Sequence, residues 1–257
     1  MTALRDTWYL TGRRLRNFSR QPWNIALTLA QPIIYLLLFG ALFKRIVELP
    51  GFGNQSYLTY LTPGIVAVSA LYTGGWLGVS LVLDLERGVL DRFLVSPVSR
   101  SALIAGQLIQ TSLMTAIQSI ILIGLGWAVG ARFPGGAAQA GAMIVAAMLL
   151  TAGFGALSCA TAIVIRQQES IIGMNQMLLL PMTFASTIFI ARELMPGWMQ
   201  QVARVNPLDW AVEASRVADG ASVDWSLVLS RTGLLLALAI AAAWLATRSF
   251  RVYQRAI

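Results

Sequence analysis

The sequence predicts an all-α integral membrane protein with six transmembrane helices. Of its 257 residues, 57% are hydrophobic and only 12% are charged, whereas soluble domains carry about 25% charged residues. Several apolar runs reach about 20 residues, the length at which a helix crosses about 30 Å of hydrocarbon. Low charge and long apolar runs together predict a single membrane domain over residues 1–257.

The six predicted spans follow from these apolar runs. They cover Trp23–Phe43, Pro63–Leu83, Ser101–Val129, Gly141–Ile165, Ile171–Ile190 and Leu227–Thr247. Pro32 and Pro181 are tolerable inside spans because neighbouring helices can satisfy the backbone groups that proline frees. Gly74 and Gly78, four residues apart, predict a point at which two helices approach closely.

The distribution of basic residues predicts that both termini lie in the cytosol. The net charge is +8, and Arg and Lys are more frequent in the N-terminal segment, in residues 84–100 and at the C-terminal end than in the segments that alternate with them. Cytoplasmic segments carry such an excess. Basic residues beside apolar spans favour contact with anionic membrane lipid over nucleic acid, because the chain offers no soluble basic face. We expect an N-terminus that is not cleaved.

The segment before the first span, residues 1–22, predicts an amphipathic helix that lies in the membrane surface. An apolar stripe recurs at spacings of four and three residues, at Leu4, Trp8, Thr11, Leu15 and Phe18. Arginines occupy the other faces, as in helices that lie in the plane of the interface. A basic tail that only orients the first span is the alternative interpretation.

A charged segment, residues 84–100, separates the second and third spans. It reads DLERGVLDRFLVSPVSR, and its apolar and charged residues fall on different faces of a helix that ends before Pro97. Such a helix could rest its apolar face on the bilayer. The alternation of carboxylates and guanidinium groups instead favours docking of a soluble cytosolic partner.

The outer segment before the last span, residues 191–226, predicts short helices. One apolar helical stripe consists of Met195, Trp198, Met199, Val202 and Val205. Trp210 and Trp225 are suited to a membrane interface. The segment is expected to dip into the outer leaflet or to cap the bundle.

The residue types disfavour catalysis by this chain. It has no His and a single cysteine, Cys159, which excludes an intrachain disulfide and a Cys/His metal site. The only lysine, Lys44, is not in a phosphate-binding loop, so the chain cannot hold its own site for ATP of that type. No ionisable residue lies near the centre of a predicted span, which disfavours an ion-driven carrier. We expect no bound cofactor and no enzymatic activity, so energy for transport would have to come from another chain.

Polar residues and methionines in two predicted spans are candidates for a cargo path. In the fifth span they are Asn175, Gln176, Met177, Thr183, Ser186 and Thr187. The third span carries a polar stripe at Gln107, Thr111, Thr115 and Gln118. These side chains could line a cavity for an amphipathic substrate at a dimer axis, or they could hydrogen-bond between helices.

Over nearly its whole length the chain resembles the membrane subunits of ABC-2 type exporters. The resemblance is to permeases of the daunorubicin-resistance type and of nodulation lipo-oligosaccharide export. Its most specific parts are YLTPGIV at the start of the second span, ERGVLDRFLVSPVSR after it, and MPGWMQQVARVNPLDWAVEASR before the last span. It implies that residues 1–22 are a connecting helix, residues 84–100 a coupling helix and residues 191–226 re-entrant helices of an outer gate.

The resemblance also implies partners and site residues. The coupling helix would dock on a separate ATPase subunit through Glu86, Arg87, Gly88, Asp91, Arg92, Phe93 and Pro97. The outer gate would include Trp198, Asn206 and Pro207. Two permeases, a homodimer or a pair with a paralogue, would assemble with two ATPase subunits that bind ATP and Mg²⁺.

The implied function is outward transport across a bacterial inner membrane. The cargo would be a hydrophobic or amphipathic drug, lipid or glycolipid. The class stays this broad because the family's cargo preferences do not map onto a compact motif. A membrane scaffold that docks a soluble partner without transporting anything is the alternative function.

Overall fold

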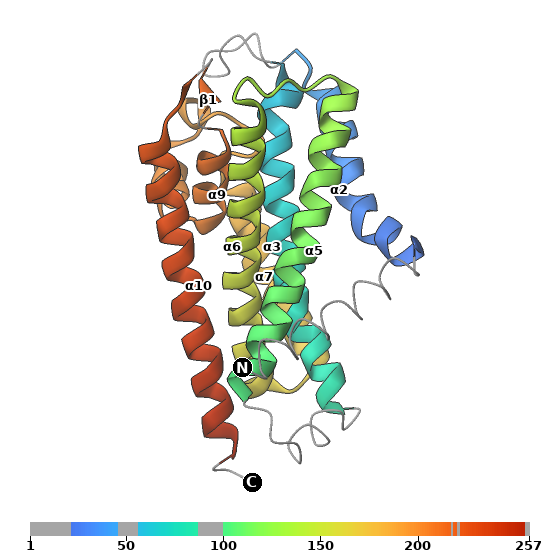
Figure 1. Ribbon diagram of the computed structural model, residues 1–257, viewed down its shortest axis with the longest axis vertical. Coiled ribbons are helices and arrows are strands. Elements are labelled where there is room, and N and C mark those ends of the chain that lie inside the picture. Colours follow the sequence, from blue (N-terminus) through green and yellow to red (C-terminus); the bar gives the residue numbers. More distant parts are fainter. Residues whose placement is uncertain (1–21, 46–55, 87–99, 217, 220–221, 255–257) are drawn as a thin grey trace.

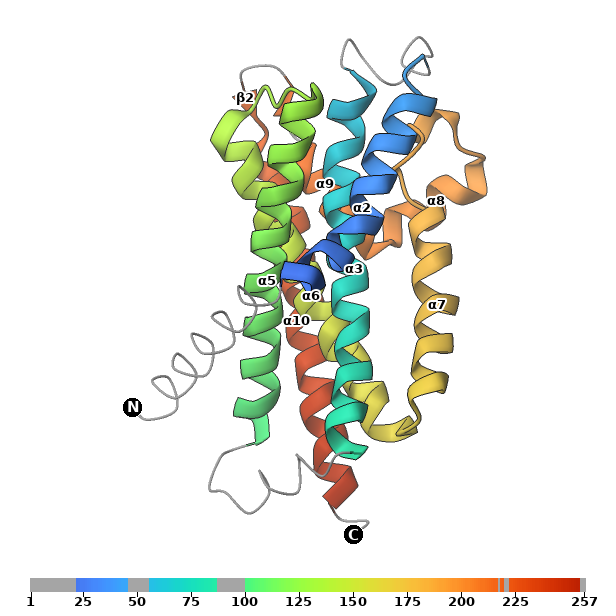
Figure 2. The ribbon, with the colours of Figure 1, turned by 90° about the vertical axis from the view of Figure 1, so that its right-hand side faces the viewer.

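The computed structural model describes residues 22–45, 56–86, 100–216, 218–219 and 222–254, which form an elongated helical bundle (Figures 1 and 2). The longer helices are α2 (Pro22–Leu42), α3 (Tyr57–Glu86), α5 (Arg100–Val129), α6 (Gly136–Ile165), α7 (Gln168–Phe184) and α10 (Trp225–Gln254). Between α7 and α10 the chain forms η2 (Arg192–Leu194), α8 (Gly197–Val205), α9 (Pro207–Ser215) and the antiparallel hairpin of β1 (Ala218–Asp219) and β2 (Ser222–Val223).

Helices α3 and α6 form the centre of the bundle. In the most apolar stretch of α3, 72% of the residues are buried, against 22% in α10. Helices α5 and α10 pack on α6, and α2 and α7 pack on α3. The outlying α10 leaves large apolar side chains exposed, among them Leu236, Ile240 and Trp244. An apolar surface of this extent is typical of a helix that contacts lipid or another protein chain.

Glycines allow α3 to lie directly against α6. A Cβ atom on Gly74 would come within 2.8 Å of the Thr151 carbonyl oxygen, and one on Gly78 within 2.3 Å of the Ser158 carbonyl oxygen. The Ser158 hydroxyl donates to the Gly75 carbonyl at 2.6 Å, so a hydrogen bond reinforces the close packing. The approach predicted from Gly74 and Gly78 is confirmed.

Four helices of the described residues are long and apolar enough to cross a membrane. They are Tyr57–Glu86, Ile104–Val129, Gly136–Ile165 and Trp225–Ser249. The described part of α2 contributes a shorter apolar stretch, Thr28–Leu42. The membrane class and the helical architecture are therefore confirmed, while only four of the six predicted spans are full-length apolar helices here.

Helix α7 has 17 residues and ends at Phe184, before the end of the fifth predicted span, Ile171–Ile190. The Ser186 hydroxyl donates to the Thr183 carbonyl at 2.7 Å. The amide of Thr187 donates to the carboxylate of Asp209 at 2.8 Å instead of to a carbonyl of the preceding turn. Hydrogen bonds of this kind compete with the helical ladder and turn the chain away from the helix axis.

The connections fall at two ends of the bundle (Figures 1 and 2). The end of α3, the start of α5, the turn from α6 to α7 and the C-terminal part of α10 lie at one end, called here the Glu86 end. The β hairpin and the connection between α5 and α6 lie at the other, called here the hairpin end. The predicted connecting-helix stripe from Leu4 to Phe18 lies outside the described residues.

Candidate functional site

Several hydrogen bonds converge on one residue, Asn206, between α8 and α9. The Asn206 amide donates to the carbonyls of Met182 at 2.8 Å and Ala185 at 3.2 Å. Its oxygen accepts the Leu208 amide at 3.0 Å, and Pro207 opens α9. Asn206 thus caps the end of α7 and the start of α9 together.

One turn into α9, Asp209 has a side chain that is 0% exposed. Its carboxylate accepts hydrogen bonds from the amide of Thr187 at 2.8 Å and from the Thr187 hydroxyl at 2.5 Å. It also forms an ion pair with Arg192 at 2.5 Å. A buried carboxylate needs such partners, because removing it from water is costly unless it is both paired and hydrogen-bonded.

Arg192 extends the charged network towards α10. Its guanidinium contacts Glu213 at 2.6 Å, and the other oxygen of Glu213 lies 2.7 Å from Nε of Arg231 in the second turn of α10. Burial by itself would lower the pKa of Arg192, but the charges of Glu213 and Asp209 outweigh it and raise that pKa above its ordinary value. Arg192 therefore remains charged while it joins two carboxylates.

Arg216, directly after α9, joins α9 to the first turn of α3. Its guanidinium lies 3.5 Å from the centre of the Tyr60 ring, a cation–π contact. It donates to the carbonyls of Tyr60 at 2.9 Å, Thr187 at 2.7 Å and Ile188 at 3.2 Å. The Tyr60 hydroxyl also donates to the Thr187 carbonyl at 2.7 Å, so α3, the end of α7 and α9 meet at one point.

We call this set the hairpin-end junction: Tyr60, Thr187, Arg192, Asp209, Glu213, Arg216 and Arg231. Sequence reasoning missed the junction because it treated residues 191–226 as an outer segment without a polar core. Asp209, Glu213 and Arg216 follow one another at spacings of four and three residues, which places them on one face of a helix. That charged face was the available signal.

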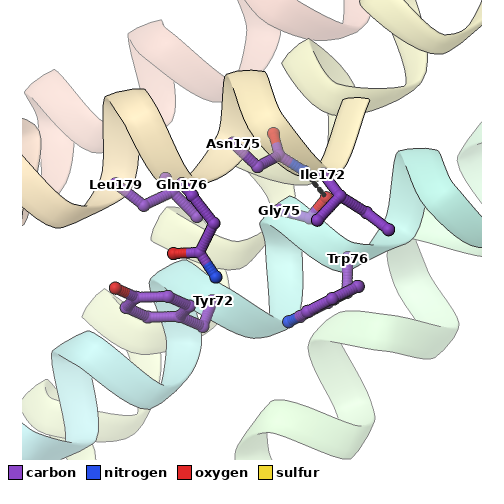
Figure 3. A pocket seen from close by; sticks show the side chains of 7 residues that line it. All are labelled: Tyr72, Gly75, Trp76, Ile172, Asn175, Gln176 and Leu179. Carbon is purple, nitrogen blue, oxygen red and sulfur yellow. Dashed lines mark hydrogen bonds between the residues drawn. The ribbon is translucent and has the colours of Figure 1, made fainter. Parts of the chain in front are cut away.

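A second feature is a hollow between α3 and α7 (Figure 3). Tyr72 and Trp76 of α3 lie on one side, with Asn175 and Gln176 of α7 on the other, and the empty volume is about 210 Å³. The Asn175 amide donates to the Gly75 carbonyl at 2.7 Å. The Gln176 amide extends towards the Tyr72 ring (Figure 3). Much of this volume is open to the surroundings, so the hollow does not enclose a ligand as it stands, but it combines two aromatic rings with an exposed amide.

The structure separates the six candidate cargo residues of the fifth span into two groups. Asn175 and Gln176 line the hollow, and the neighbouring Met177 is 83% exposed. The buried group consists of Thr183, Ser186 and Thr187, nearer the hairpin end. These three residues hydrogen-bond to α7 or to the junction.

Two residues of the polar stripe in α5 bridge helices. The Thr115 hydroxyl lies 3.0 Å from the Thr151 hydroxyl of α6, and Gln118 accepts a hydrogen bond from the Thr73 hydroxyl of α3 at 3.2 Å. At Thr115 and Gln118, the structure therefore shows hydrogen bonds between helices, which was one of the two interpretations of the polar stripe.

The predicted outer-gate residues also fall into two groups, one that supports the junction and one that is exposed. Asn206 and Pro207 belong to the turn that supports the junction, whereas Trp198 is 64% exposed on α8. Val202 and Val205 are exposed beside it. The apolar face of α8 therefore points away from the bundle core.

Of the predicted coupling residues, Glu86 is the exposed last residue of α3. The others lie outside the described residues: Arg87, Gly88, Asp91, Arg92, Phe93 and Pro97. Among the residues that the structure does describe, no group of three or more His, Cys, Asp or Glu side chains could hold a metal ion.

Comparison with known proteins agrees with this architecture. The family model described as ABC-2 type transporter matches residues 5–219. The chain is 31% identical over 218 residues to the daunorubicin resistance ABC transporter permease protein DrrB1 of Streptomyces coeruleorubidus, covering 84% of this chain and 75% of the relative. It is 22% identical over 212 residues to the probable doxorubicin resistance permease DrrC of Mycobacterium tuberculosis, covering 82% and 75%.

A third relative is the probable multidrug ABC transporter permease YbhR of Escherichia coli, 28% identical over 165 residues, which cover 60% of this chain and 42% of that protein. Membrane permeases of this family have no ATPase activity of their own. The family match spans most of the described bundle, including α3, α9 and every residue of the junction except Arg231. The chain therefore belongs to the ABC-2 type transporter family, as the membrane permease of an ABC exporter.

Proposed function

We propose that this permease exports a hydrophobic or amphipathic small molecule, driven by a separate ATPase subunit that docks on residues 84–97. The observation that carries the proposal is the course of α3. This central helix ends at the exposed Glu86 and begins at Tyr57, three residues before the junction residue Tyr60. Its 30 residues span about 45 Å at 1.5 Å per residue. A force applied at the Glu86 end would therefore reach the hairpin end through one helix.

The proposed complex contains two permeases, taken here as a homodimer, and two ATPase subunits in a bacterial inner membrane. Each permease would have six spans, with α2 and α7 as the first and fifth, and both termini in the cytosol. Both helices expose apolar side chains that need lipid or a second permease as a neighbour; examples are Ile34 and Leu38 of α2 and Met177 and Leu180 of α7. Closed two-fold dimers are the commonest way in which identical chains assemble.

The cargo is proposed to be a drug-like molecule or a lipid. The names of the relatives refer to daunorubicin, doxorubicin and multidrug transport, which supports an amphipathic aromatic compound. We place its path along the α3–α7 hollow, because Tyr72 and Trp76 offer aromatic faces and Gln176 offers an amide. Aromatic side chains supply large contact areas with specific geometry, and a few polar groups fix the orientation of a ligand.

In the proposed cycle, ATP binding draws the two ATPase subunits together and hydrolysis lets them separate. The docked segment 84–97 would shift the Glu86 end of α3, and Arg216 would carry that shift to α9. Nucleotide can bias the bundle only through a difference in affinity between its two conformations. The residues at the hairpin end would then open or close the outer gate.

The docking contact is tested by Glu86→Arg in the reconstituted permease–ATPase complex. Charge reversal at the exposed end of α3 should leave membrane insertion intact and separate ATP hydrolysis from export, since the partner's docking surface would meet the opposite charge. We expect transport to fall by about ten-fold, the effect of 1.4 kcal/mol, while hydrolysis continues. Transport in proteoliposomes and phosphate release are measured on the same preparation.

Glu169→Arg is the matched control, because Glu169 is an exposed glutamate at the start of α7 at the same end of the bundle. It should transport at the wild-type rate. If Glu86→Arg also transports at that rate, the proposed docking contact is wrong. If the wild-type complex shows no substrate-stimulated hydrolysis, the chain is a scaffold rather than a transporter.

A further inference from the structure

Helix α7 is attached to the bundle by few buried side chains. Of its 17 residues, three are buried, Ile171, Leu179 and Thr183, whereas most residues of α3 are buried. Large apolar side chains of α7 such as Met177 and Phe184 are exposed instead. Each contact that α7 makes with α3 therefore has a large share in fixing its position.

Two of these contacts meet at Gly75 of α3. The Asn175 amide donates to the Gly75 carbonyl at 2.7 Å. One turn further along α7, Leu179 lies so close that a Cβ atom on Gly75 would come within 2.7 Å of its Cδ1 atom. Residues four apart share a helix face, so Asn175 and Leu179 together set the distance between the two helices at this point.

The Gly75 carbonyl is also held by α6. The Ser158 hydroxyl donates to it at 2.6 Å and accepts a hydrogen bond from the Gly78 amide at 3.2 Å. Because Ser158 is itself buried, Asn175 binds a carbonyl that is fixed at the centre of the bundle. One side-chain amide thus connects α7 to both α3 and α6.

The residues of this contact, Gly75, Asn175 and Leu179, line the hollow between α3 and α7. Figure 3 shows the hydrogen bond beside the rings of Tyr72 and Trp76. Carbon atoms attract one another best at about 3.5–4.0 Å and lose much of that attraction when the gap widens by about 1 Å. The distance fixed at Gly75 therefore decides how thick a molecule can contact both the rings and α7.

We propose that Asn175 is a positioning residue that holds α7 at the distance at which the hollow accepts a flat aromatic molecule in preference to a bulky one. Without its bond to Gly75, α7 moves outward more easily, because few buried side chains then hold it. The inference rests on the proposed export function, but the helix separation can be measured without a transport assay.

The test compares Asn175→Leu with Gln176→Leu. Leu has the branched shape of Asn with methyl groups in place of the amide, so Asn175→Leu removes the bond to Gly75. Gln176 lines the same hollow but makes no hydrogen bond to α3 within the described part of the chain, so Gln176→Leu is the matched control. KM and kcat are measured on the reconstituted permease–ATPase complex for two fluorescent amphiphiles of equal charge, one flat and polycyclic and the other globular.

In Asn175→Leu, the KM for the globular probe divided by the KM for the flat probe should fall about three-fold, the effect of one average hydrogen bond between membrane helices. Gln176→Leu removes a polar group that either probe can bind, so both KM values should change together and their ratio should stay that of the parent. A general loss of folded permease would lower kcat for both probes and leave the ratio unchanged.

The helix separation is measured by double electron–electron resonance between spin labels on Ser80→Cys of α3 and Met177→Cys of α7, in a Cys159→Ala background. Ser80 and Met177 are exposed. Labelled permease is diluted with unlabelled chains, so that both labels of a pair belong to one chain. In lipid nanodiscs without nucleotide, the mean distance should be longer in Asn175→Leu and unchanged in Gln176→Leu.

The positioning role is overturned if the label distance in Asn175→Leu equals that of the parent, or if the KM ratio does not fall in a complex that exports both probes. Should Asn175→Leu fail to insert, Asn175→Ala removes the same bond and must give the longer distance. A longer distance in a complex that exports neither probe would contradict the proposed function but support the positioning role. An unchanged distance in a complex that exports both would contradict the positioning role alone.

Discussion

At the scale of single residues, Asp209 shows how one buried charge decides the local path of the chain. Its carboxylate is withdrawn from water and is offset by Arg192 and by two hydrogen bonds from Thr187. Because the Thr187 amide is used in this way, it cannot continue the hydrogen-bond ladder of α7. One side chain therefore both ends a helix and anchors the first turn of α9.

Asp209→Asn is expected to destabilise the permease strongly. The change removes the fully buried negative charge opposite the half-buried guanidinium of Arg192, and breaking a pair that includes a buried charge costs about 3 kcal/mol. Asp224→Asn is the matched control, because Asp224 is exposed and caps the start of α10, where Asn serves as well as Asp. The thermal unfolding midpoint in detergent should fall by several degrees only for Asp209→Asn. Equal midpoints would mean that the buried ion pair contributes no net stability.

At the scale of helices, α3 combines several roles that usually belong to separate elements. It packs against α6 through Gly74 and Gly78, lines the hollow with Tyr72 and Trp76, and binds Arg216 through its first turn. A residue change on one face of α3 should therefore affect cargo recognition without disturbing the packing face. The hollow offers the clearest case, because Trp76 is 48% exposed.

Trp76→Ala should weaken the binding of aromatic cargo. The loss of one aromatic face is worth about 1 kcal/mol, or about five-fold in KM for a fluorescent amphipathic aromatic probe exported by the reconstituted complex. Trp127→Ala is the control, since Trp127 is a 63% exposed residue of α5 away from the hollow. A similar KM for the two variants would exclude Trp76 from the cargo path.

At the scale of the whole molecule, the connections gather at two ends of one bundle (Figures 1 and 2). Segments that the positive-inside rule assigns to the cytosol share the Glu86 end: the start of residues 84–100, Arg166, and the C-terminal part of α10. The hairpin and the charged junction share the opposite side of the molecule. The spatial grouping agrees with the orientation that the charges predict.

Cysteine accessibility in intact cells tests this orientation. Both Ser170, in the first turn of α7, and Ser226, in the first turn of α10, are exposed, so each can be replaced by Cys in a Cys159→Ala background. A membrane-impermeant maleimide should label position 226 in intact cells and position 170 only after permeabilisation. The reverse pattern would invert the proposed topology and, with it, the side on which the ATPase docks.

The sequence by itself was sufficient for the membrane class, the long helices and the close approach at Gly74 and Gly78. These properties are local: hydrophobicity, segment length and glycine spacing act over one helix or one helix face. The positions of η2 and α9 within residues 191–226, and the early end of α7 relative to Ile171–Ile190, were not predicted. The coupling role of the residues from Glu86 to Pro97 and the cargo path remain predictions.

Only the tertiary structure decided which charges meet. Asp209 binds Arg192 across 17 residues, and Arg216 binds the main chain of Tyr60 across 156 residues. The sequence shows that such side chains are charged and share a helix face. Which group each of them binds depends on how helices distant in the sequence pack together. A buried charge is stable only with that partner in place, so the junction exists as a site only once α3, α9 and α10 have come together.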